Sequence, residues 1–293
     1  MQRTGPIEQP HLRPWSTVLR IPVRNGAVFF KETAPTMAND AGLTKLLSTV
    51  VPSVVTAPLA VEGRRMLMSD AGPRLREELD RERDLRWWER ILPAYAELQR
   101  EAAAHVDALL DAGALDNRLE RLPALLAELL DDPGLELQAA EIDALRGLQP
   151  ALAAACAALS VTARPSIQHD DLHDGNVHLD GDGFRILDWG DASVSHPFGT
   201  LLVTLRSVAY RFEIAEDAPE LDRLRHAYLE PWQDLGSKSE LRQASELATW
   251  LAIVGRAVVW RNALVGADAG ELAEWGDAVP DALRMVIDRR PEG

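Results

Sequence analysis

The first 70 residues alternate apolar and polar positions in the manner of β-strands. Two runs rich in branched and aromatic residues, 18–23 and 27–33, are joined by Arg24-Asn25-Gly26. An Asn-Gly pair between such runs favours a tight hairpin, because both residues tolerate positive φ. Further elements are expected before residue 70: a helix at residues 41–48 and short strands at 50–55, 59–61 and 65–68. The pattern predicts a small β-rich unit with one helix.

From residue 73 the apolar positions recur at helical spacing through most of the chain. The expected helices cover residues 75–112 with a division near Pro93, 119–130, 139–159 with an interruption at Pro150, and most of 197–287. A short β-hairpin over residues 177–187 is the exception. The chain is therefore predicted to be an α+β protein of two lobes: a β-rich N-terminal lobe with its hinge at residues 1–72, and a larger, mostly helical lobe at residues 73–293.

Charge narrows the classes of partner. The 293 residues carry 31 Lys and Arg against 46 Asp and Glu, a net charge of −15. This balance argues against nucleic acid or an anionic membrane as the main partner. An acidic surface serves solubility and also attracts cationic substrates, and both readings stay open.

The expected compartment follows from the targeting segments, membrane spans and cysteines that the sequence offers. Residues 1–14 lack the apolar core of a signal peptide, and the longest membrane-span candidate, residues 250–260, is short and broken by Arg256. The single cysteine, Cys156, lies in an apolar helical run and is expected to be a core thiol. We expect a cytoplasmic protein, a monomer or a homodimer.

The most specific chemical signal is the stretch Gln-His-Asp-Asp-Leu-His-Asp-Gly-Asn at residues 168–176, followed by Asp-Trp-Gly at 188–190. Asp171 and Asn176 share one loop, and Asp188 ends a short apolar strand. In phosphoryl transfer one carboxylate takes the proton of an acceptor hydroxyl, while an Asn and an Asp hold Mg²⁺ against nucleotide phosphates. The pattern predicts Asp171 as the catalytic base and Asn176 and Asp188 as the magnesium ligands.

Two other interpretations of the same stretch exist. One is a surface turn whose Asp and Asn side chains serve only local hydrogen bonds, which explains residues 180–183 well but not the spacing of the remaining set. The other is a metal-dependent phosphohydrolase whose ligands come from the loop and its flanks, namely His169, Asp170, Asp171, His173, Asp174 and His178. For His169 itself we expect a structural role that orients the loop.

The spacing His169-x-Asp171-x₄-Asn176, followed by Asp188-Trp189-Gly190, resembles the aminoglycoside phosphotransferase family, whose members have the protein-kinase-like fold. The resemblance implies a nucleotide bound between the lobes, ATP or alternatively GTP, together with Mg²⁺. It also implies an activity, the transfer of a phosphoryl group to an alcohol.

The resemblance extends into the N-terminal lobe. Residues 66–72 are similar to the hinge of these enzymes, which implies that adenine lies beside Met68 and bonds to the carbonyl of Ser69 and the amide of Ala71. Lys31 matches the lysine that contacts the α- and β-phosphates. Its partner on the following helix is usually Glu in the family, and here the candidate is Asp40, which is one methylene shorter.

Three positions depart from the family pattern. Asp170 stands between His169 and Asp171 where Gly is common, and it adds a negative charge beside the base. The region of the nucleotide-covering loop, residues 10–16, contains no glycine. Thr200 stands where an Asp often braces the catalytic loop.

The acceptor is expected to be a small molecule, because only residues 191–195 separate Gly190 from His196-Pro197 and leave no room for a peptide-binding segment. Carboxylates and tryptophans cluster on the later helices: Glu213, Glu216, Asp217, Glu220, Asp222, Trp250 and Trp260. One interpretation is a binding site for a cationic acceptor. The other is an ordinary solvated acidic face with tryptophans in the core. The predicted function is an ATP- and Mg²⁺-dependent O-phosphotransferase acting on a small hydroxylated molecule that can be cationic, such as an aminoglycoside-like antibiotic, in which case it would serve antibiotic resistance, or a related metabolite. A kinase of a sugar, a choline-like alcohol, homoserine or a macrolide, and a non-catalytic nucleotide-binding protein, remain as alternatives.

Overall fold

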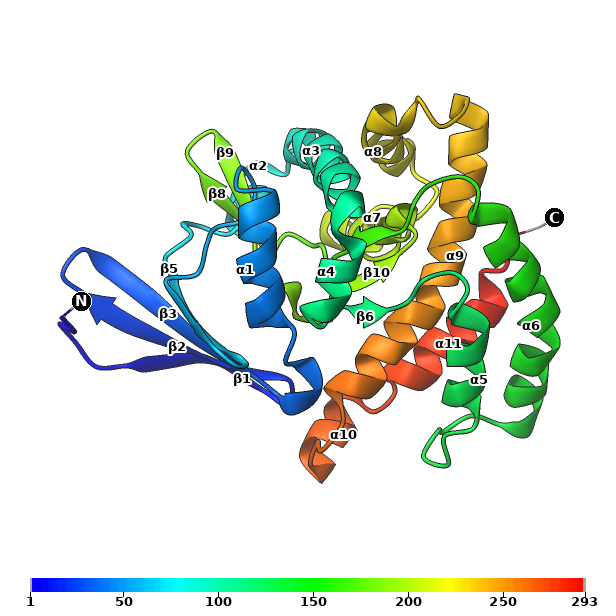
Figure 1. Cartoon of the computed structure of the whole chain (residues 1–293), viewed down its shortest axis with the longest axis horizontal. Coiled ribbons are helices and arrows are strands. Elements are labelled where there is room, and N and C mark those ends of the chain that lie inside the picture. Colours follow the sequence, from blue (N-terminus) through cyan, green and yellow to red (C-terminus); the bar gives the residue numbers. More distant parts are fainter. Residues whose placement is uncertain (1, 292–293) are drawn as a thin grey trace.

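A computed structural model of the chain describes residues 2–291 and confirms the α+β architecture. An antiparallel five-stranded sheet forms the N-terminal part, and helices make up most of the remainder (Figure 1). The sheet order is β1-β2-β3-β5-β4. Its strands are β1 Glu8–Arg13, β2 Ser16–Val23, β3 Gly26–Thr33, β4 Ala60–Glu62 and β5 Arg65–Ser69.

The predicted hairpin is confirmed as β2 and β3, which pair from Ser16 opposite Thr33 to Val23 opposite Gly26. Gly26 has φ of +116°, which a side chain would oppose. Strand β1 was not expected from the sequence. It lies at the sheet edge with mostly exposed polar side chains, so it lacks the alternation that reveals a half-buried strand.

Helix α1 (Asp40–Val50) extends the predicted helix by one residue at its start and two at its end, and the strand expected at residues 50–55 is wrong. A short apolar β-branched run does not distinguish a buried strand from a buried loop. Here Val51, Val54 and Val55 bury their side chains as a loop, and the amides of Val54 and Val55 bond to the carbonyl of Val51.

The helical part differs from expectation mainly at its prolines. Its helices are α2 Leu75–Glu82, α3 Arg86–Ala102, α4 Val106–Asp111, α5 Leu122–Leu130, α6 Ala139–Leu159, α7 Leu201–Phe212, α8 Pro219–Leu229, α9 Lys238–Ala263, α10 Ala269–Trp275 and α11 Ala278–Asp288. Pro93 and Pro150 lie inside α3 and α6 and end neither helix. The first break falls instead at Arg83, whose left-handed φ of +48° terminates α2.

Helix α9 runs through the helical part and packs against α5, α6, α7 and α11 (Figure 1). The helical part also contains two small sheets: the hairpin of β8 (Val177–Asp180) and β9 (Gly183–Ile186), which lies near α1 and α2 (Figure 1), and the sheet β6-β10-β7. The strands of the latter are β6 Leu115–Asp116, β7 Ser166–Gln168 and β10 Ser193–Ser195. Within residues 2–291, no helix is both long and apolar enough to cross a bilayer.

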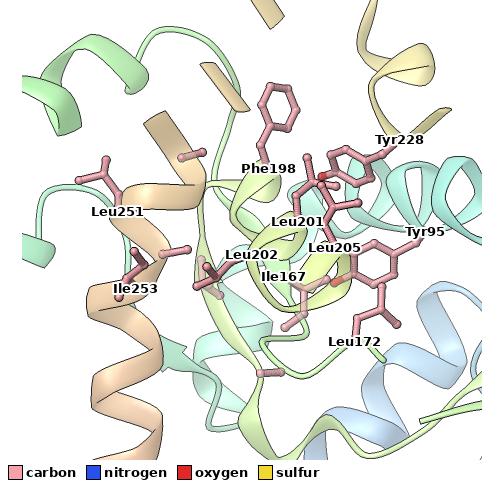
Figure 2. Close-up of a cluster of buried hydrophobic side chains, with 14 of the residues drawn as sticks. Tyr95, Ile167, Leu172, Phe198, Leu201, Leu202, Leu205, Tyr228, Leu251 and Ile253 are labelled. Carbon is pink, nitrogen blue, oxygen red and sulfur yellow. The ribbon is translucent and has the colours of Figure 1, made fainter. Parts of the chain in front are cut away.

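A buried apolar cluster lies under the loop that joins β7 to β8. Figure 2 shows Ile167 before this loop and Leu172 within it, facing Tyr95 of α3 and side chains of α7. Both Ile167 and Leu172 are completely buried. Because burying one such side chain contributes about 1.5–3 kcal/mol, the loop is anchored on both sides of Asp171.

Candidate active site

The loop between β7 and β8 is held by hydrogen bonds to buried groups. The Tyr95 hydroxyl accepts the amide of His169 at 2.9 Å. His169 Nδ1 accepts the amide of Asp171 at 3.3 Å, so its Nε2–H donates to the carbonyl of Leu187 at 3.0 Å. Burial lowers the pKa of His169, which favours this neutral form. His169 therefore orients the loop, as the sequence predicted.

Asp171 and Asn176 are in contact. Asn176 Nδ2 donates to the main-chain oxygen of Asp171 at 2.9 Å and to its Oδ2 at 3.1 Å. Two further groups contact the same carboxylate: His173 Nε2 at 3.2 Å from Oδ2, and Arg256 Nη2 at 3.2 Å from Oδ1. Burial opposes ionisation, but Arg256 and then His173 hold the pKa of Asp171 below its usual range. The carboxylate is ionised at neutral pH and can accept a hydrogen bond from a hydroxyl.

Lys31 bridges the two lobes. Its Nζ lies 2.6 Å from Asp40 Oδ2 on α1 and 2.5 Å from Asp188 Oδ1 after β9. Burial opposes the charge of Lys31, but Asp188 and Asp40 together raise its pKa. Asp40 is completely buried and its Oδ1 accepts the amide of Trp189 at 2.9 Å. The shorter Asp40 side chain thus reaches Lys31 because α1 packs directly against residues 189–191.

Asn176 and Asp188 have the oxygen atoms that a magnesium ion requires. Asn176 uses its Nδ2 on Asp171, which leaves Oδ1 as a neutral ligand. Asp188 gives one carboxylate oxygen to Lys31, and its side chain is half exposed, so the second oxygen is accessible. Mg²⁺ takes one or two protein oxygens and completes its shell with phosphate and water. The donor set therefore fits this ion.

The predicted hinge residues lie at the junction of the two lobes. Met68 and Ser69 are the last residues of β5, and Ala71 follows two positions later. At Gly72, φ is +87° and a Cβ would lie 2.5 Å from the carbonyl oxygen of Leu179, so only glycine fits. The segment that would meet adenine is thereby fixed against β8, the strand that begins directly after Asn176.

Sequence reasoning missed the residue that contacts Asp171 from α9. Arg256 donates to Asp171, to Asp191 Oδ2 at 2.5 Å and to the carbonyl of Asp170 at 3.1 Å. Its only sequence signal was a single charge in the apolar run 250–260, which is typical of a buried, paired arginine. Asp191 is the second missed residue. Burial raises its pKa to about 6, while Arg256 opposes the rise.

Asp170 does not present an exposed, charged carboxylate to Asp171. Asp170 is buried with φ of +61°, a region that glycine enters without strain. Its carboxylate accepts hydrogen bonds from Ser193 Oγ at 2.5 Å and from Gln168 Nε2. Burial raises the pKa of Asp170 to about 7, against these hydrogen bonds and the charge of Arg256.

Bracing of the loop comes from residues other than Thr200. Thr204 Oγ1 donates to the carbonyl of Leu172 at 2.9 Å. Asp174 joins the loop to α2 and α7, because Arg76 lies 3.1 Å and Arg211 2.7 Å from its carboxylate. Thr200 is buried nearby, where its chain neighbour Leu201 belongs to the core under the loop.

A tight turn at Pro14-Trp15 stands where the family has a nucleotide-covering loop. It joins β1 to β2, and Ser16 after it lies 3.2 Å from His11 Nε2. Trp15 reaches across to the helical part, with ring centroids 5.8 Å from Trp260 on α9 and 5.5 Å from Trp275 on α10. This turn is therefore held by aromatic contacts between the lobes.

A cavity of about 810 Å³ lies between α7, α9 and α11. Arg256, which pairs with Asp171, lines it, whereas Asp171 itself does not. Of the predicted acceptor residues, Glu213, Glu216 and Trp260 line this cavity. The others do not; they are Asp217, Glu220, Asp222 and Trp250. The indole of Trp250 instead bonds to the carbonyl of Val286 in the core.

Comparison with known proteins agrees with this geometry. The model of the phosphotransferase enzyme family matches residues 16–241, which contain Lys31 and the whole catalytic loop. The chain belongs to this phosphotransferase family. It is accordingly an enzyme that transfers phosphoryl groups, and the small-molecule kinases among the similar structures agree with a small acceptor. No curated protein matches the chain.

Solved structures of phosphotransferases share the fold at low sequence identity. A GDP and kanamycin complex of APH(2")-IIIa has a TM-score of 0.62 at 16% identity and covers 99% of this chain and 94% of its own. Ethanolamine kinase of Plasmodium vivax has 0.60 at 10%, covering 97% and 82%. Macrolide 2'-phosphotransferase of Brachybacterium faecium has 0.59 at 13%, covering 93% and 91%. This similarity confirms the expected two-lobed kinase-like fold.

Proposed function

We propose that this phosphotransferase moves the γ-phosphoryl group of ATP, or of GTP, to a hydroxyl group of a small molecule, with Asp171 as the catalytic base. The main support is the carboxylate of Asp171, which is kept ionised by Arg256 and His173, together with a cavity of about 810 Å³ that Arg256 lines. A carboxylate in that position accepts a hydrogen bond from a hydroxyl group of the acceptor and thereby directs the hydroxyl oxygen at the phosphorus atom.

The reaction then follows from the positions of the side chains. The acceptor oxygen forms a bond to the γ-phosphorus, the bond from that phosphorus to the β–γ bridging oxygen breaks, and the acceptor proton passes to Asp171. Lys31, held by Asp40, would contact the α- and β-phosphates. Asn176 and Asp188 would hold Mg²⁺, which supplies charge neutralisation at the phosphates when bound.

The nucleotide base has a place of its own in this proposal. Adenine would lie beside Met68 and bond to the carbonyl of Ser69 and the amide of Ala71. No main-chain hydrogen bond involves this carbonyl or this amide outside the strand pairing of β5, within the described residues. ATP and GTP differ in the edge presented to such a hinge, so the preference between them is a direct measurement.

The alternative of a metal phosphohydrolase has little support. Across residues 2–291, no group of three or more His, Cys, Asp or Glu side chains is arranged to hold a metal ion. His169, which that alternative needs as a ligand, uses both ring nitrogens on main-chain groups.

The test is phosphate transfer from labelled ATP and GTP to a panel of aminoglycosides, sugars and amino alcohols, with and without Mg²⁺. Replacement Asp171→Asn should abolish transfer and leave nucleotide affinity within about threefold, because the base contacts the acceptor and not the nucleotide. Asp182→Asn, an exposed position in the β8–β9 turn, is the matched control and should behave like wild type. Wild-type turnover in the Asp171 variant would refute the assignment of the base.

A further inference from the structure

Two arginines face the cavity between α7, α9 and α11, and one of them has no strong partner. Arg206 of α7 and Arg256 of α9 both line the cavity. Arg256 is fully engaged by Asp171 and Asp191. Arg206, by contrast, makes no hydrogen bond within the described part of the chain. The carboxylate that it pairs with, Glu216, lies 3.7 Å away.

Glu216 is itself committed to another residue. Both terminal nitrogens of Arg289 bind its carboxylate, at 2.5 and 2.8 Å, in the bidentate geometry that makes the strongest arginine pairs. Arg206 therefore keeps guanidinium N–H groups that no protein acceptor satisfies, and because 45% of its side chain is exposed, these groups are open to water or to a ligand in the cavity. Burial and the like charges of Arg289 and Arg256 lower the pKa of Arg206, while Glu216 opposes this. An anion at this point would relieve that repulsion.

The acidic residues of the cavity are less available than their number suggests. Asp281 is paired with Arg284 at 2.9 Å and Glu216 with Arg289, so Glu213 is the lining carboxylate that has no ion pair in the region described. Most of the remaining wall is apolar or aromatic, including Leu202, Val203, Tyr210, Ile253, Trp260 and Met285. Counted in the same way, Arg256 is neutralised by Asp171 and Asp191, so a polyamine would find one free carboxylate, Glu213, and would be repelled by the weakly paired guanidinium of Arg206.

We propose that the acceptor is a hydroxylated molecule with an apolar or flat ring face and one anionic oxygen group, a carboxylate or a phosphate, bound by Arg206, and that it is not a polycation. The inference rests on the proposed function and narrows its substrate class. The apolar wall takes the ring face, Arg206 takes the anionic group, and the acceptor hydroxyl lies towards Asp171, next to Arg256. Arg206 thus acts as a specificity residue that contacts the acceptor and leaves the reacting atoms alone.

The experiment compares acceptors that differ only in charge. Phenyl β-D-glucoside and phenyl β-D-glucuronide share one ring face and all but one hydroxyl, and differ in a CH₂OH or a carboxylate. Glucose 6-phosphate tests a phosphate as the anion, and kanamycin tests a polycation. Binding is measured by calorimetry with Mg²⁺ and ADP present, and turnover by phosphate transfer from ATP and GTP. Calorimetry gives a result even for a compound that binds without being phosphorylated.

We expect an anionic member of the panel to bind at least tenfold more tightly than phenyl β-D-glucoside, and kanamycin to bind more weakly than either. The variant Arg206→Gln should remove this preference and raise the KM of the anionic acceptor at least tenfold, with kcat within about threefold. Its affinity for the neutral glucoside should not change. Arg223→Gln, which removes an exposed arginine of α8, is the control for net charge.

Three results would overturn the inference: equal binding of neutral and anionic compounds, strongest binding of kanamycin, or an equal loss for all acceptors in Arg206→Gln. Each leaves the proposed function intact if phosphate is still transferred and Asp171→Asn abolishes the transfer. Failure of the proposed function looks different. The protein would then transfer no phosphate to any acceptor and would hydrolyse no nucleotide beyond the level of the Asp171 variant, whatever the order of binding affinities.

Discussion

Replacing Arg256 by Gln should move the pH dependence of the reaction in a calculable direction. Arg256 lies 3.2 Å from Asp171 Oδ1, and 16% of its side chain is exposed. Two unit charges about 4 Å apart interact with about 4 kcal/mol at an effective dielectric constant of about 20. Since about 1.36 kcal/mol corresponds to one pKa unit, the upper limit is about 3 units. We expect a rise of about 1–3 units in the pKa of Asp171.

The sign follows from the direction of the native shift. Arg256 and His173 hold the pKa of Asp171 below its usual range, so wild-type kcat/KM should be flat from about pH 5 to 7. Without Arg256 the carboxylate takes up its proton at higher pH, so the acid limb, which in wild type lies below the ordinary range of an aspartate, should move up towards that range by about 1–3 pH units. Turnover at pH 7 should also fall about 10–100-fold, because the carboxylate loses one of the groups that orient it.

The assay is kcat/KM against pH for wild type, Arg256→Gln and Arg256→Lys. The lysine variant keeps the positive charge but loses the planar guanidinium group that contacts Asp191 and Asp171 at the same time. Its acid limb should therefore stay at the pH of the wild-type limb, while its kcat/KM falls. Loss of stability should be below the usual cost of about 3–5 kcal/mol for breaking a buried pair. The reason is Asp191, whose pKa is already raised to about 6 and which can become neutral. The profiles are followed down to about pH 3, and an acid limb at the same pH in wild type and Arg256→Gln would refute this reasoning.

Three further predictions concern the lobes and the loop. Lys31→Met should lower kcat/KM for nucleotide at least 100-fold, which steady-state kinetics measure. It should also destabilise the fold by about 3–5 kcal/mol in thermal unfolding, because Asp40 remains buried without its counterion. Asp170→Asn should flatten the pH dependence of stability between about pH 4 and 7 in denaturant titrations. The native pKa of about 7 lies above the ordinary value of 3.8 for this side chain, so wild type loses stability as pH rises through that window. Thr204→Val should cost about 1–3 kcal/mol in unfolding experiments, because the carbonyl of Leu172 loses its donor.

Each of these predictions has a matched control and a contrary outcome. For Lys31→Met the control is Lys45→Met on the exposed side of α1, and unchanged nucleotide kinetics would contradict the role of Lys31. The control for Asp170→Asn is Asp182→Asn. Parallel curves of stability against pH for the Asp170 variant and wild type would show that Asp170 does not titrate between about pH 4 and 7. For Thr204→Val it is Thr36→Val in an exposed position, and equal stability of the two variants would contradict the bracing role.

Local pattern was sufficient for the hairpin and for the catalytic motif. The Asn-Gly turn fixes β2 against β3 through neighbouring residues, and Asp171, Asn176 and Asp188 lie within one loop and the hairpin after it. Lys31 was placed only through the resemblance to a family, because its contacts with Asp188 span 157 positions. Its ion pair with Asp40 could not be derived from side-chain length, since it depends on how closely α1 packs.

Residues that act through tertiary contacts escaped the sequence analysis. Arg256 lies 85 positions from Asp171, and nothing near it in the chain indicates which carboxylates it binds. The acidic cluster expected to face the acceptor was misleading for the same reason. Glu216 has a bidentate partner in Arg289, 73 positions away, so its charge is already compensated. Counting charges along a helix cannot reveal such pairing.

The turn at Pro14-Trp15 has a consequence for the rate at which nucleotide enters and leaves. A glycine-rich flap moves freely, whereas here a proline fixes one residue and the Trp15 ring rests on Trp260 and Trp275. Each aromatic contact contributes about 0.5–1.5 kcal/mol, so parting the two pairs slows opening by roughly one order of magnitude or more. If this turn covers the nucleotide, departure of the product would be slowed by the same factor, and emission of the Trp15 indole, one of eight in the chain, would change on opening.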